Sequence, residues 1–254
     1  MRVLILGGSR EARELAHATA GERGLEIVSS LAGRVRDPHL PVGQVRIGGF
    51  GGADALRDWL AAEDIAAVVN ATHPFAARIG ANTAVATAAL GIPLLRVLRP
   101  AWSEQPGDRW IRVADLDAAA RTLSEFGDRV FLTIGRQGVG AFAALSRQWF
   151  LIRAIDPPDG ALPPHHELLL ARGPFALEDE IALLSEYRVD VVVTKDSGGD
   201  QTEAKLVAAR AAGLPVIVID RPALPPGVTA VDTVEQARDW LLRMVVHSDP
   251  ESAR

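Results

Sequence analysis

Residues 2–13 read RVLILGGSREAR, and this stretch indicates the fold class. The apolar run from Val3 to Leu6 shows no polar alternation, which predicts a strand buried on both faces. Two glycines follow the run, and Ser9 then stands where the N-cap of a helix is expected. A buried strand, a glycine turn and a helix in this order are typical of an α/β protein with a parallel sheet.

The same alternation of apolar runs and helical patterns continues outward along the 254 residues. It stops at Leu98, where a segment with two prolines and a glycine predicts a boundary, and starts again at Arg109. We therefore expect an α/β fold with two Rossmann-like lobes, mostly parallel sheets and a cleft between them.

The predicted lobes are residues 1–98 and residues 99–254. The sequence leaves open on which lobe the final predicted helix, residues 232–246, packs. A further helix is predicted to follow the strand Val130 to Ile134 and to end at Leu145.

The composition excludes several classes of function. The chain carries a net charge of −5 and no long basic run, so we expect no nucleic-acid partner. It contains no cysteine, which excludes disulfides, thiolate metal sites and cysteine nucleophiles. No apolar stretch approaches the roughly 20 residues that span a membrane. The six histidines show no metal-ligand spacing. We expect a cytoplasmic protein without a metal or a membrane partner.

Glycines, hydroxyls and cations follow most of the predicted strands. Because the carboxyl ends of parallel strands share one edge of a sheet, we expect these residues to gather at ligand-binding edges. Turn chemistry accounts for the glycines but not for Arg136, Lys195 or His73. The segments concerned are Gly7 to Glu11, Ser29 to Arg34, Gly48 to Gly52, Asn70 to Phe75, Arg99 to Trp102, Thr133 to Gly138 and Thr194 to Gly199.

The first two of these segments favour a phosphorylated dinucleotide. Gly7 and Gly8 let a phosphate approach the backbone at a helix N-terminus, although Ser9 replaces the second glycine of the usual dinucleotide fingerprint. The second strand ends at Ser30 with Arg34 close behind, and no carboxylate is there to hold the ribose of NAD. The pattern therefore favours NADP over NAD.

Other common chemistries are excluded by missing motifs. The only tyrosine, Tyr187, lacks the lysine four residues later that short-chain dehydrogenases need, because Val191 stands there. Neither a serine nucleophile elbow nor a nucleotide-hydrolase phosphate loop occurs. Hydride transfer from a bound nicotinamide remains, since it requires positioning more than a nucleophile.

Taken together, the motifs resemble those of the precorrin-6A reductases. This resemblance implies an NADPH-dependent reduction of one double bond of precorrin-6A to precorrin-6B, in the pathway to vitamin B12. The matching segments are Leu6 to Arg13, Gly48 to Gly51, Ala71 to Ala76, Arg99 to Trp102, Thr133 to Gly138 and Thr194 to Gly199.

The resemblance also implies candidate site residues. For NADPH binding they are Gly7, Gly8, Ser9, Arg10, Glu11, Ser30, Arg34, Gly49, Thr72 and His73. For binding the carboxylates of the tetrapyrrole substrate they are Arg99, Arg136, Gln137, Lys195 and Ser197. For catalysis they are Lys195, Asp196 and His73, with Asp196 or the carboxylates of the substrate delivering the proton.

Several alternatives stay open at this stage. Asp196 could instead cap a helix or pair with Lys195, and His73 could be structural. The function could be that of a cobalt-precorrin-6A reductase of the anaerobic route, a non-catalytic NADP-binding sensor, or a reductase of a smaller substrate. Other enzymes of the pathway are expected partners if the substrate is channelled. The sequence does not identify the proton donor or the oligomeric state.

Overall fold

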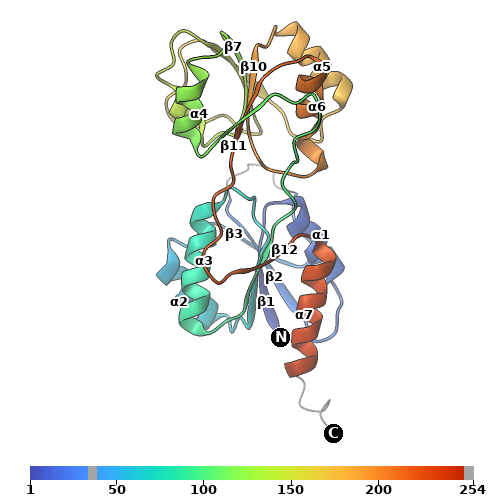
Figure 1. Cartoon of the computed structure of the whole chain (residues 1–254). Helices are drawn as coiled ribbons and strands as arrows, with labels where there is room; N and C mark the ends of the chain where they lie inside the picture. The colour runs from blue at the N-terminus through green and yellow to red at the C-terminus, as the bar shows by residue number, and fades with distance from the viewer. Residues whose placement is uncertain (34–38, 249–254) are drawn as a thin grey trace. The chain divides into compact units, whose positions relative to one another are not determined.

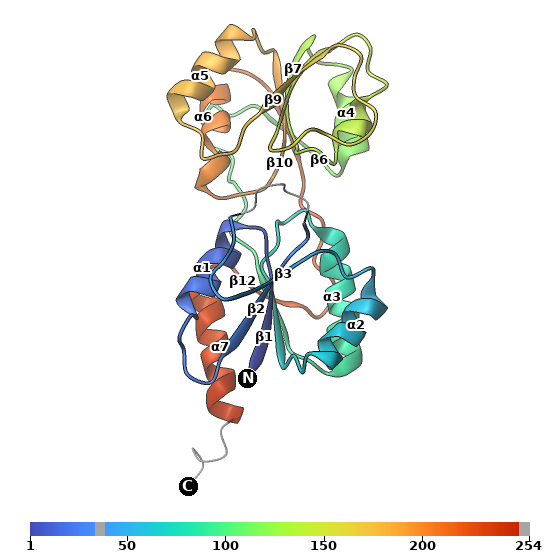
Figure 2. The ribbon, with the colours of Figure 1, turned by 180° about the vertical axis from the view of Figure 1, so that it is seen from behind.

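The computed structural model describes residues 1–33 and 39–248, which form two compact units (Figures 1 and 2). Unit 1 contains Met1–Arg99 and the chain from Pro222 onward, and unit 2 contains Pro100–Arg221. Each unit is built on a sheet of six strands, and all the strand pairs are parallel. The predicted α/β class with parallel sheets is confirmed.

Unit 1 has the strand order β3-β2-β1-β4-β5-β12, in which the order reverses between β1 and β4. This is the order of classical dinucleotide-binding sheets. Its strands are β1 (Arg2–Leu6), β2 (Glu26–Leu31), β3 (Gln44–Ile47), β4 (Ala67–Asn70), β5 (Leu94–Val97) and β12 (Thr229–Val231). Its helices are α1 (Arg10–Ala18), α2 (Ala53–Ala62), α3 (Ala77–Leu90) and α7 (Val234–Ser248).

The central strand β1 is buried on both faces, as its unbroken apolar run predicts. Val3 and Ile5 pack in a cluster with Leu15 of α1 and Leu241 of α7. Leu4 and Leu6 point to the other face and pack with residues of α2 and α3. Figure 1 shows the same layers, with α1 and α7 on one face of this sheet and α2 and α3 on the other.

Unit 2 has the strand order β9-β8-β7-β10-β11-β6. Its strands are β6 (Trp110–Val113), β7 (Arg129–Thr133), β8 (Trp149–Ala154), β9 (His166–Leu170), β10 (Val191–Lys195) and β11 (Val216–Ile219). Its helices are α4 (Leu116–Leu123), α5 (Leu177–Glu186) and α6 (Ala204–Ala211), with short 3-10 helices η1 (Val139–Phe142) and η2 (Asp200–Thr202).

The two sheets have the same arrangement of strands. Strand β7 takes the place in unit 2 that β1 takes in unit 1, and the order reverses next to it, between β7 and β10. In each sheet, the edge strand on the side of β5 or β11 does not come next in the sequence after the strand that it pairs with. In unit 1 this strand is β12, which follows all of unit 2 in the sequence, and in unit 2 it is β6, which precedes β7.

The structure differs from the sequence prediction in two places. The chain returns to unit 1 at Pro222, so β12 does not belong to the predicted lobe of residues 99–254, and α7, whose lobe the sequence left open, belongs to unit 1. Helix α7 packs on α1, and β12 extends the sheet next to β5. The helix predicted up to Leu145 is only the four-residue η1, because three glycines disfavour a longer helix there.

Candidate functional site

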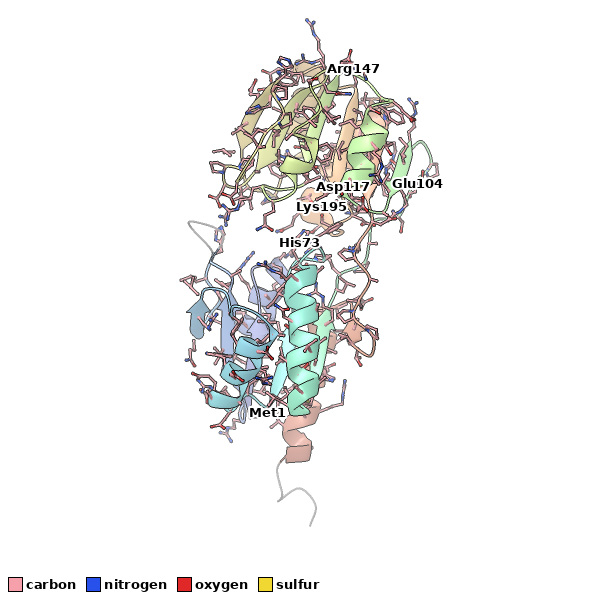
Figure 3. The ribbon with its side chains drawn as sticks, turned by 90° about the vertical axis from the view of Figure 1, so that its left-hand side faces the viewer. Met1, His73, Glu104, Asp117, Arg147 and Lys195 are labelled. Carbon is pink, nitrogen blue, oxygen red and sulfur yellow. The ribbon has the colours of Figure 1, made fainter. Side chains whose placement is uncertain are left out.

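The carboxyl edge of unit 1 is where its predicted cofactor residues gather. His73 and Met1 lie at opposite ends of this unit, with Met1 before the amino end of β1 (Figure 3). The turns after β1 and β4 flank the reversal of strand order, which is where open α/β sheets bind ligands.

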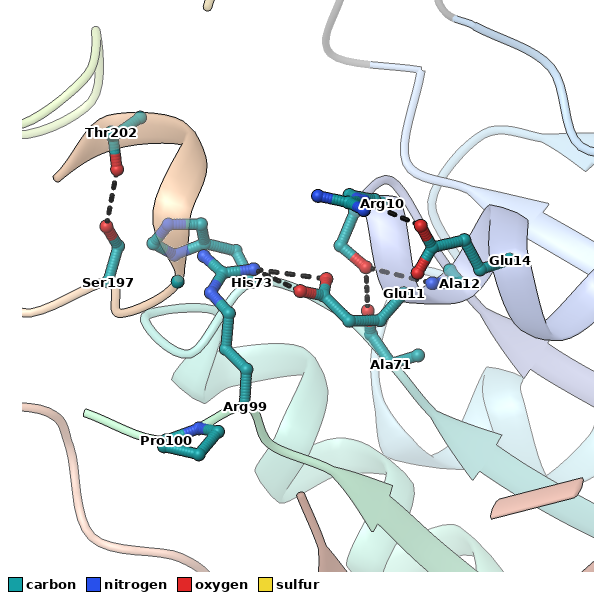
Figure 4. Close-up of polar contacts among 12 residues, drawn as sticks. Arg10, Glu11, Ala12, Glu14, Ala71, His73, Arg99, Pro100, Ser197 and Thr202 are labelled. Atoms are coloured by element: carbon teal, nitrogen blue, oxygen red, sulfur yellow. Dashed lines mark hydrogen bonds and ion pairs between the residues drawn. The ribbon is translucent and has the colours of Figure 1, made fainter. Parts of the chain in front are cut away.

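Ser9 joins these two turns. Its hydroxyl donates a hydrogen bond of 2.6 Å to the carbonyl of Ala71, which follows β4, and accepts one of 3.1 Å from the backbone N–H of Ala12 (Figure 4). The predicted N-cap role is thus confirmed. The fixed hydroxyl positions the N-terminus of α1 at the edge of the sheet, where its N–H groups favour an anion.

The glycines of the first turn have separate structural reasons. A Cβ on Gly7 would lie 3.2 Å from Cβ of Ala12, so this glycine lets helix α1 approach the strand. Gly8 has φ of +103°, and a Cβ built on it would meet no atom within 4 Å. The turn therefore presents bare backbone next to a helix N-terminus, which fits the needs of a pyrophosphate.

Glu11 and Arg99 form an ion pair across this edge. Nη1 of Arg99 lies 3.0 and 3.1 Å from the two carboxylate oxygens of Glu11, and both side chains are mostly buried (Figure 4). Burial raises the pKa of Glu11, but Arg99 and hydrogen bonds to the carboxylate lower it more, so the net pKa lies below the ordinary value. Arg10, the residue before, pairs with Glu14 at 2.6 Å. The acid in the first turn of α1 is therefore balanced by a cation.

The end of β2 is polar and carries a cation from the neighbouring strand. Ser30 is buried, and Arg46 of β3 lies opposite it in the parallel register. The Arg46 guanidinium donates hydrogen bonds to the carbonyls of Gly48 and Gly49, at 2.5 and 2.9 Å. The predicted cofactor residue Gly49 is thus held through its carbonyl by Arg46. The predicted cofactor residue Arg34 lies outside the described residues.

Arg96 organises the turn after β4 that holds Thr72 and His73. This buried side chain donates hydrogen bonds to the carbonyl and the side-chain oxygen of Asn70, to the carbonyl and hydroxyl of Thr72, and to the carbonyl of His73. The imidazole of His73 is exposed, and its Nδ1 accepts a hydrogen bond of 3.2 Å from the N–H of Phe75. A single arginine therefore sets the path of the backbone at two predicted site residues.

In unit 2 the predicted residue Lys195 ends β10, and Asp196 and Ser197 follow it. Lys195 and Arg147 lie at opposite ends of this unit, which places Lys195 at the carboxyl edge (Figure 3). Burial lowers the pKa of the Lys195 ammonium below its ordinary value. The hydroxyl of Ser197 lies 3.3 Å from that of Thr202, within hydrogen-bond distance (Figure 4).

Asp196 is buried, and both its carboxylate oxygens are engaged. Oδ1 accepts a hydrogen bond from the backbone N–H of Trp102 at 3.2 Å, and Oδ2 accepts one from Arg112 at 2.8 Å. Its side chain is 1% exposed. Its backbone carbonyl also accepts a hydrogen bond from Arg221 at 2.8 Å. In this arrangement Asp196 anchors the turn after β10, and its ion-pair partners are arginines.

Arg136 and Gln137 lie on the turn after β7, at the same carboxyl edge. Nη1 of Arg136 is 3.8 Å from the exposed carboxylate of Asp159, a distance that leaves a weak pair. Gln137 and Gly138 border an open hollow of about 450 Å³, together with Asp115 at the start of α4. The predicted substrate residues of unit 2 therefore lie on two turns, those after β7 and β10.

Three arginines that shape these edges lie outside the predicted site residues. Arg46, Arg96 and Arg112 each occupy the third position of a four-residue strand. A cation inside an apolar strand is unusual, and the position next to the last residue brings it to the carboxyl edge. This pattern was visible in the sequence and could have identified all three.

Within residues 1–33 and 39–248, no helix is both long enough and apolar enough to cross a bilayer. The same residues contain no group of three or more His, Asp or Glu side chains that could hold a metal ion.

Comparisons with known proteins show the family to which the chain belongs. Residues 2–242 match the family model described as precorrin-6x reductase CbiJ/CobK. The precorrin-6A reductase of Rhodococcus erythropolis is 62% identical over 240 residues, which cover 94% of this chain and 97% of the relative. The precorrin-6A reductase of Mycobacterium tuberculosis is 54% identical, with the same coverage of both chains.

A solved structure of CobK precorrin-6A reductase superimposes with a TM-score of 0.88 at 44% sequence identity and covers 96% of both chains. Relatives named cobalt-precorrin-6A reductase match at 26–28% identity. Because the family model and these relatives span nearly the whole chain, the chain belongs to the CbiJ/CobK family of precorrin-6x reductases.

Proposed function

We propose that this chain is a precorrin-6A reductase, which uses NADPH to reduce one macrocycle double bond of precorrin-6A and yields precorrin-6B in cobalamin biosynthesis. The observation that carries the proposal is the carboxyl edge of unit 1. There, a glycine turn and a capped helix N-terminus flank the reversal of strand order, next to a β2 end that bears a serine and a neighbouring arginine. The similarity to reductases of this name over almost the full chain supports it.

In this proposal unit 1 holds the cofactor. NADPH, when bound, supplies the hydride. Gly7, Gly8 and the N-terminus of α1 hold the pyrophosphate, with Ser9 fixing the helix and Arg10 at its first turn. Arg99 neutralises Glu11, which would otherwise repel the phosphates. This role differs from the substrate contact that the resemblance implies for Arg99.

The turn after β4 orients the rest of the cofactor. We assign Thr72 and His73 to the nicotinamide side, because their turn flanks the reversal of strand order opposite the phosphate turn. Arg96 holds the carbonyls of both residues, at 2.9 and 3.2 Å. A fixed turn lets hydride transfer proceed from a defined geometry.

Unit 2 supplies the groups for the acidic substrate. Arg136, Gln137 and Ser197 offer hydrogen-bond donors at the carboxyl edge, which suit the carboxylates of a tetrapyrrole. Lys195 is the proposed proton donor, because burial lowers its pKa and makes the ammonium more acidic than that of an ordinary lysine. Asp196, whose oxygens already accept two hydrogen bonds, keeps the turn in place for Lys195.

The test is a spectral assay with purified protein, NADPH and cobalt-free precorrin-6A. The proposal predicts loss of NADPH absorbance together with a change in the spectrum of the pigment. Loss of NADPH absorbance without a change in the pigment spectrum would favour a reductase of a smaller substrate. Binding of NADPH without any consumption would favour a sensor.

Two variants of Lys195 separate proton donation from simple charge recognition. Lys195→Met should abolish most of the activity and leave the Kd of NADPH unchanged, because the residue belongs to unit 2. Lys195→Arg keeps the positive charge but holds its proton much more firmly. If Lys195→Arg restores full activity, the residue grips a carboxylate and donates no proton.

A further inference from the structure

We infer that Arg46 recognises the 2′-phosphate that distinguishes NADPH from NADH. The inference rests on the proposed function, because it assigns one residue to the cofactor that this function requires. It concerns an arginine that lies outside every motif of the sequence analysis.

The position of Arg46 fits this role. In sheets of this strand order the ribose of the adenosine half lies at the end of the second strand, where NAD enzymes carry an acid and NADP enzymes an arginine nearby. Strand β2 ends here with Ser30 and Leu31, and Arg46 of β3 is opposite Ser30 in the register. Nη1 of Arg46 lies 3.4 Å from the hydroxyl of Ser30.

The guanidinium of Arg46 is held in place before any ligand binds. It lies over the ring of Phe50, 3.9 Å from its centroid, and Phe50 in turn packs edge-on against Trp59. Its contacts with the carbonyls of Gly48 and Gly49 and with Ser30 use three of its five N–H bonds. The Nε–H and one N–H of Nη2 have no acceptor within residues 1–33 and 39–248, so two donors remain for a phosphate.

The charge of Arg46 is also uncompensated, whereas three other arginines of unit 1 have carboxylate partners. Arg10 pairs with Glu14, Arg57 with Asp54, and Arg99 with Glu11. No carboxylate of the described residues lies within ion-pair distance of Arg46, whose partners are all neutral. A partly buried, immobilised cation without an anion favours binding of one from solution.

A purely structural role for Arg46, as a clamp on the Gly48–Gly49 turn, makes a different prediction. Such a clamp would affect all adenine nucleotides alike, whereas phosphate recognition affects only those with a 2′-phosphate. The probes are therefore 2′,5′-ADP and 5′-AMP, which differ in this one group and lack the nicotinamide. Isothermal titration calorimetry of the full chain gives the Kd of each.

We expect the unmodified protein to bind 2′,5′-ADP more tightly than 5′-AMP. The variant Arg46→Met keeps the length of the side chain and should weaken binding of 2′,5′-ADP by about 10- to 100-fold, the range of a lost charge-assisted contact. Binding of 5′-AMP should change less than about twofold on the same scale. Arg57→Met, a matched substitution of a paired arginine on α2, should leave both Kd values unchanged.

Two further measurements keep the test decisive. Arg46→Lys retains a charge over Phe50, so it should fold even if the methionine variant does not, and should recover part of the preference for 2′,5′-ADP. Lowering the pH below about 6 protonates the phosphate and should weaken 2′,5′-ADP binding in the unmodified protein much more than in Arg46→Met.

The outcomes separate this inference from the function on which it rests. If the unmodified protein prefers 2′,5′-ADP and folded Arg46→Met keeps the whole preference, the inference fails and the reductase proposal stands. An equal loss of both nucleotides in both Arg46 variants would identify a structural clamp and also refute the inference. If the unmodified protein binds neither nucleotide nor NADPH, the proposed function itself is overturned.

Discussion

Replacing Arg96 with methionine tests whether one buried cation holds the turn after β4. Methionine fills a similar volume in the core but can donate no hydrogen bond. The substitution removes the donor from the two oxygens of Asn70, from Thr72 and from the carbonyl of His73. We expect unit 1 to lose stability and the turn to become mobile.

The size of the effect follows from which acceptors can find another donor. The side-chain oxygen of Asn70 keeps hydrogen bonds from the N–H and hydroxyl of Thr72, and the carbonyl of exposed His73 can bind water. The carbonyls of buried Asn70 and half-buried Thr72 bear most of the cost. With about 1–3 kcal/mol for each of these two carbonyls left unpaired, the free energy of unfolding of unit 1 should fall by about 2–6 kcal/mol.

Hydrogen exchange measured by mass spectrometry in increasing urea reads out this change for each unit separately. Peptides that contain residues 66–80 should lose protection, whereas those from unit 2 should not. The Kd of NADPH should rise about tenfold or more, equivalent to about 1.4 kcal/mol. Arg57→Met on α2 is the control and should leave the stability of unit 1 nearly unchanged, because Arg57 lies on the surface. If Arg96→Met behaves like this control, the turn does not depend on Arg96.

Three further predictions concern Glu11, Lys205 and Gly198. Arg99→Met should raise the pKa of Glu11, because burial is then no longer opposed by the arginine, and an NMR titration that finds this pKa unchanged would contradict the pairing. Burial lowers the pKa of Lys205 in α6 to about 7, from the ordinary value of 10.5. Protonation of this amine therefore destabilises the folded state, and the free energy of unfolding should rise as the pH increases from about 7 toward 10.5. Lys205→Met should remove that rise and stabilise unit 2 at pH 6 by about 1–4 kcal/mol in urea unfolding; a variant less stable than the original at pH 6 would refute the reasoning. Gly198→Ala should destabilise far more than Gly213→Ala, since both glycines have φ near +65° but only a Cβ at Gly198 would lie 2.1 Å from a backbone oxygen; equal thermal midpoints would show that the backbone yields there.

Most strands could be predicted from the sequence because they are buried on both faces. The run Val189 to Val193 is apolar enough to stand out, and its residues in β10, Val191 to Val193, are fully buried. Strand β12 was missed because it is an edge strand of three largely exposed residues and follows a proline-rich segment. No local signal shows that the chain returns at Pro222 to the unit that it left at Arg99, since strand pairing over such a distance depends on tertiary structure.

The candidate site was predictable in its position more than in its contacts. Strand ends identify which residues reach a carboxyl edge, and Ser9 capped its helix as its position indicated. The pairing of Glu11 with Arg99, and of Asp196 with Arg112, joins residues more than 80 positions apart. Their partners are set by the order of strands in each sheet, which the apolar pattern does not specify.

The most direct test of the account is to follow the hydride itself. Purified protein is given precorrin-6A and NADPH in which both hydrogens on C4 of the nicotinamide are replaced by deuterium. The product is then examined by mass spectrometry. The account predicts a reduced macrocycle that contains one deuterium on carbon, formed in proportion to the NADPH consumed. A reduced product without deuterium, or consumption of NADPH that leaves the macrocycle unchanged, would contradict it.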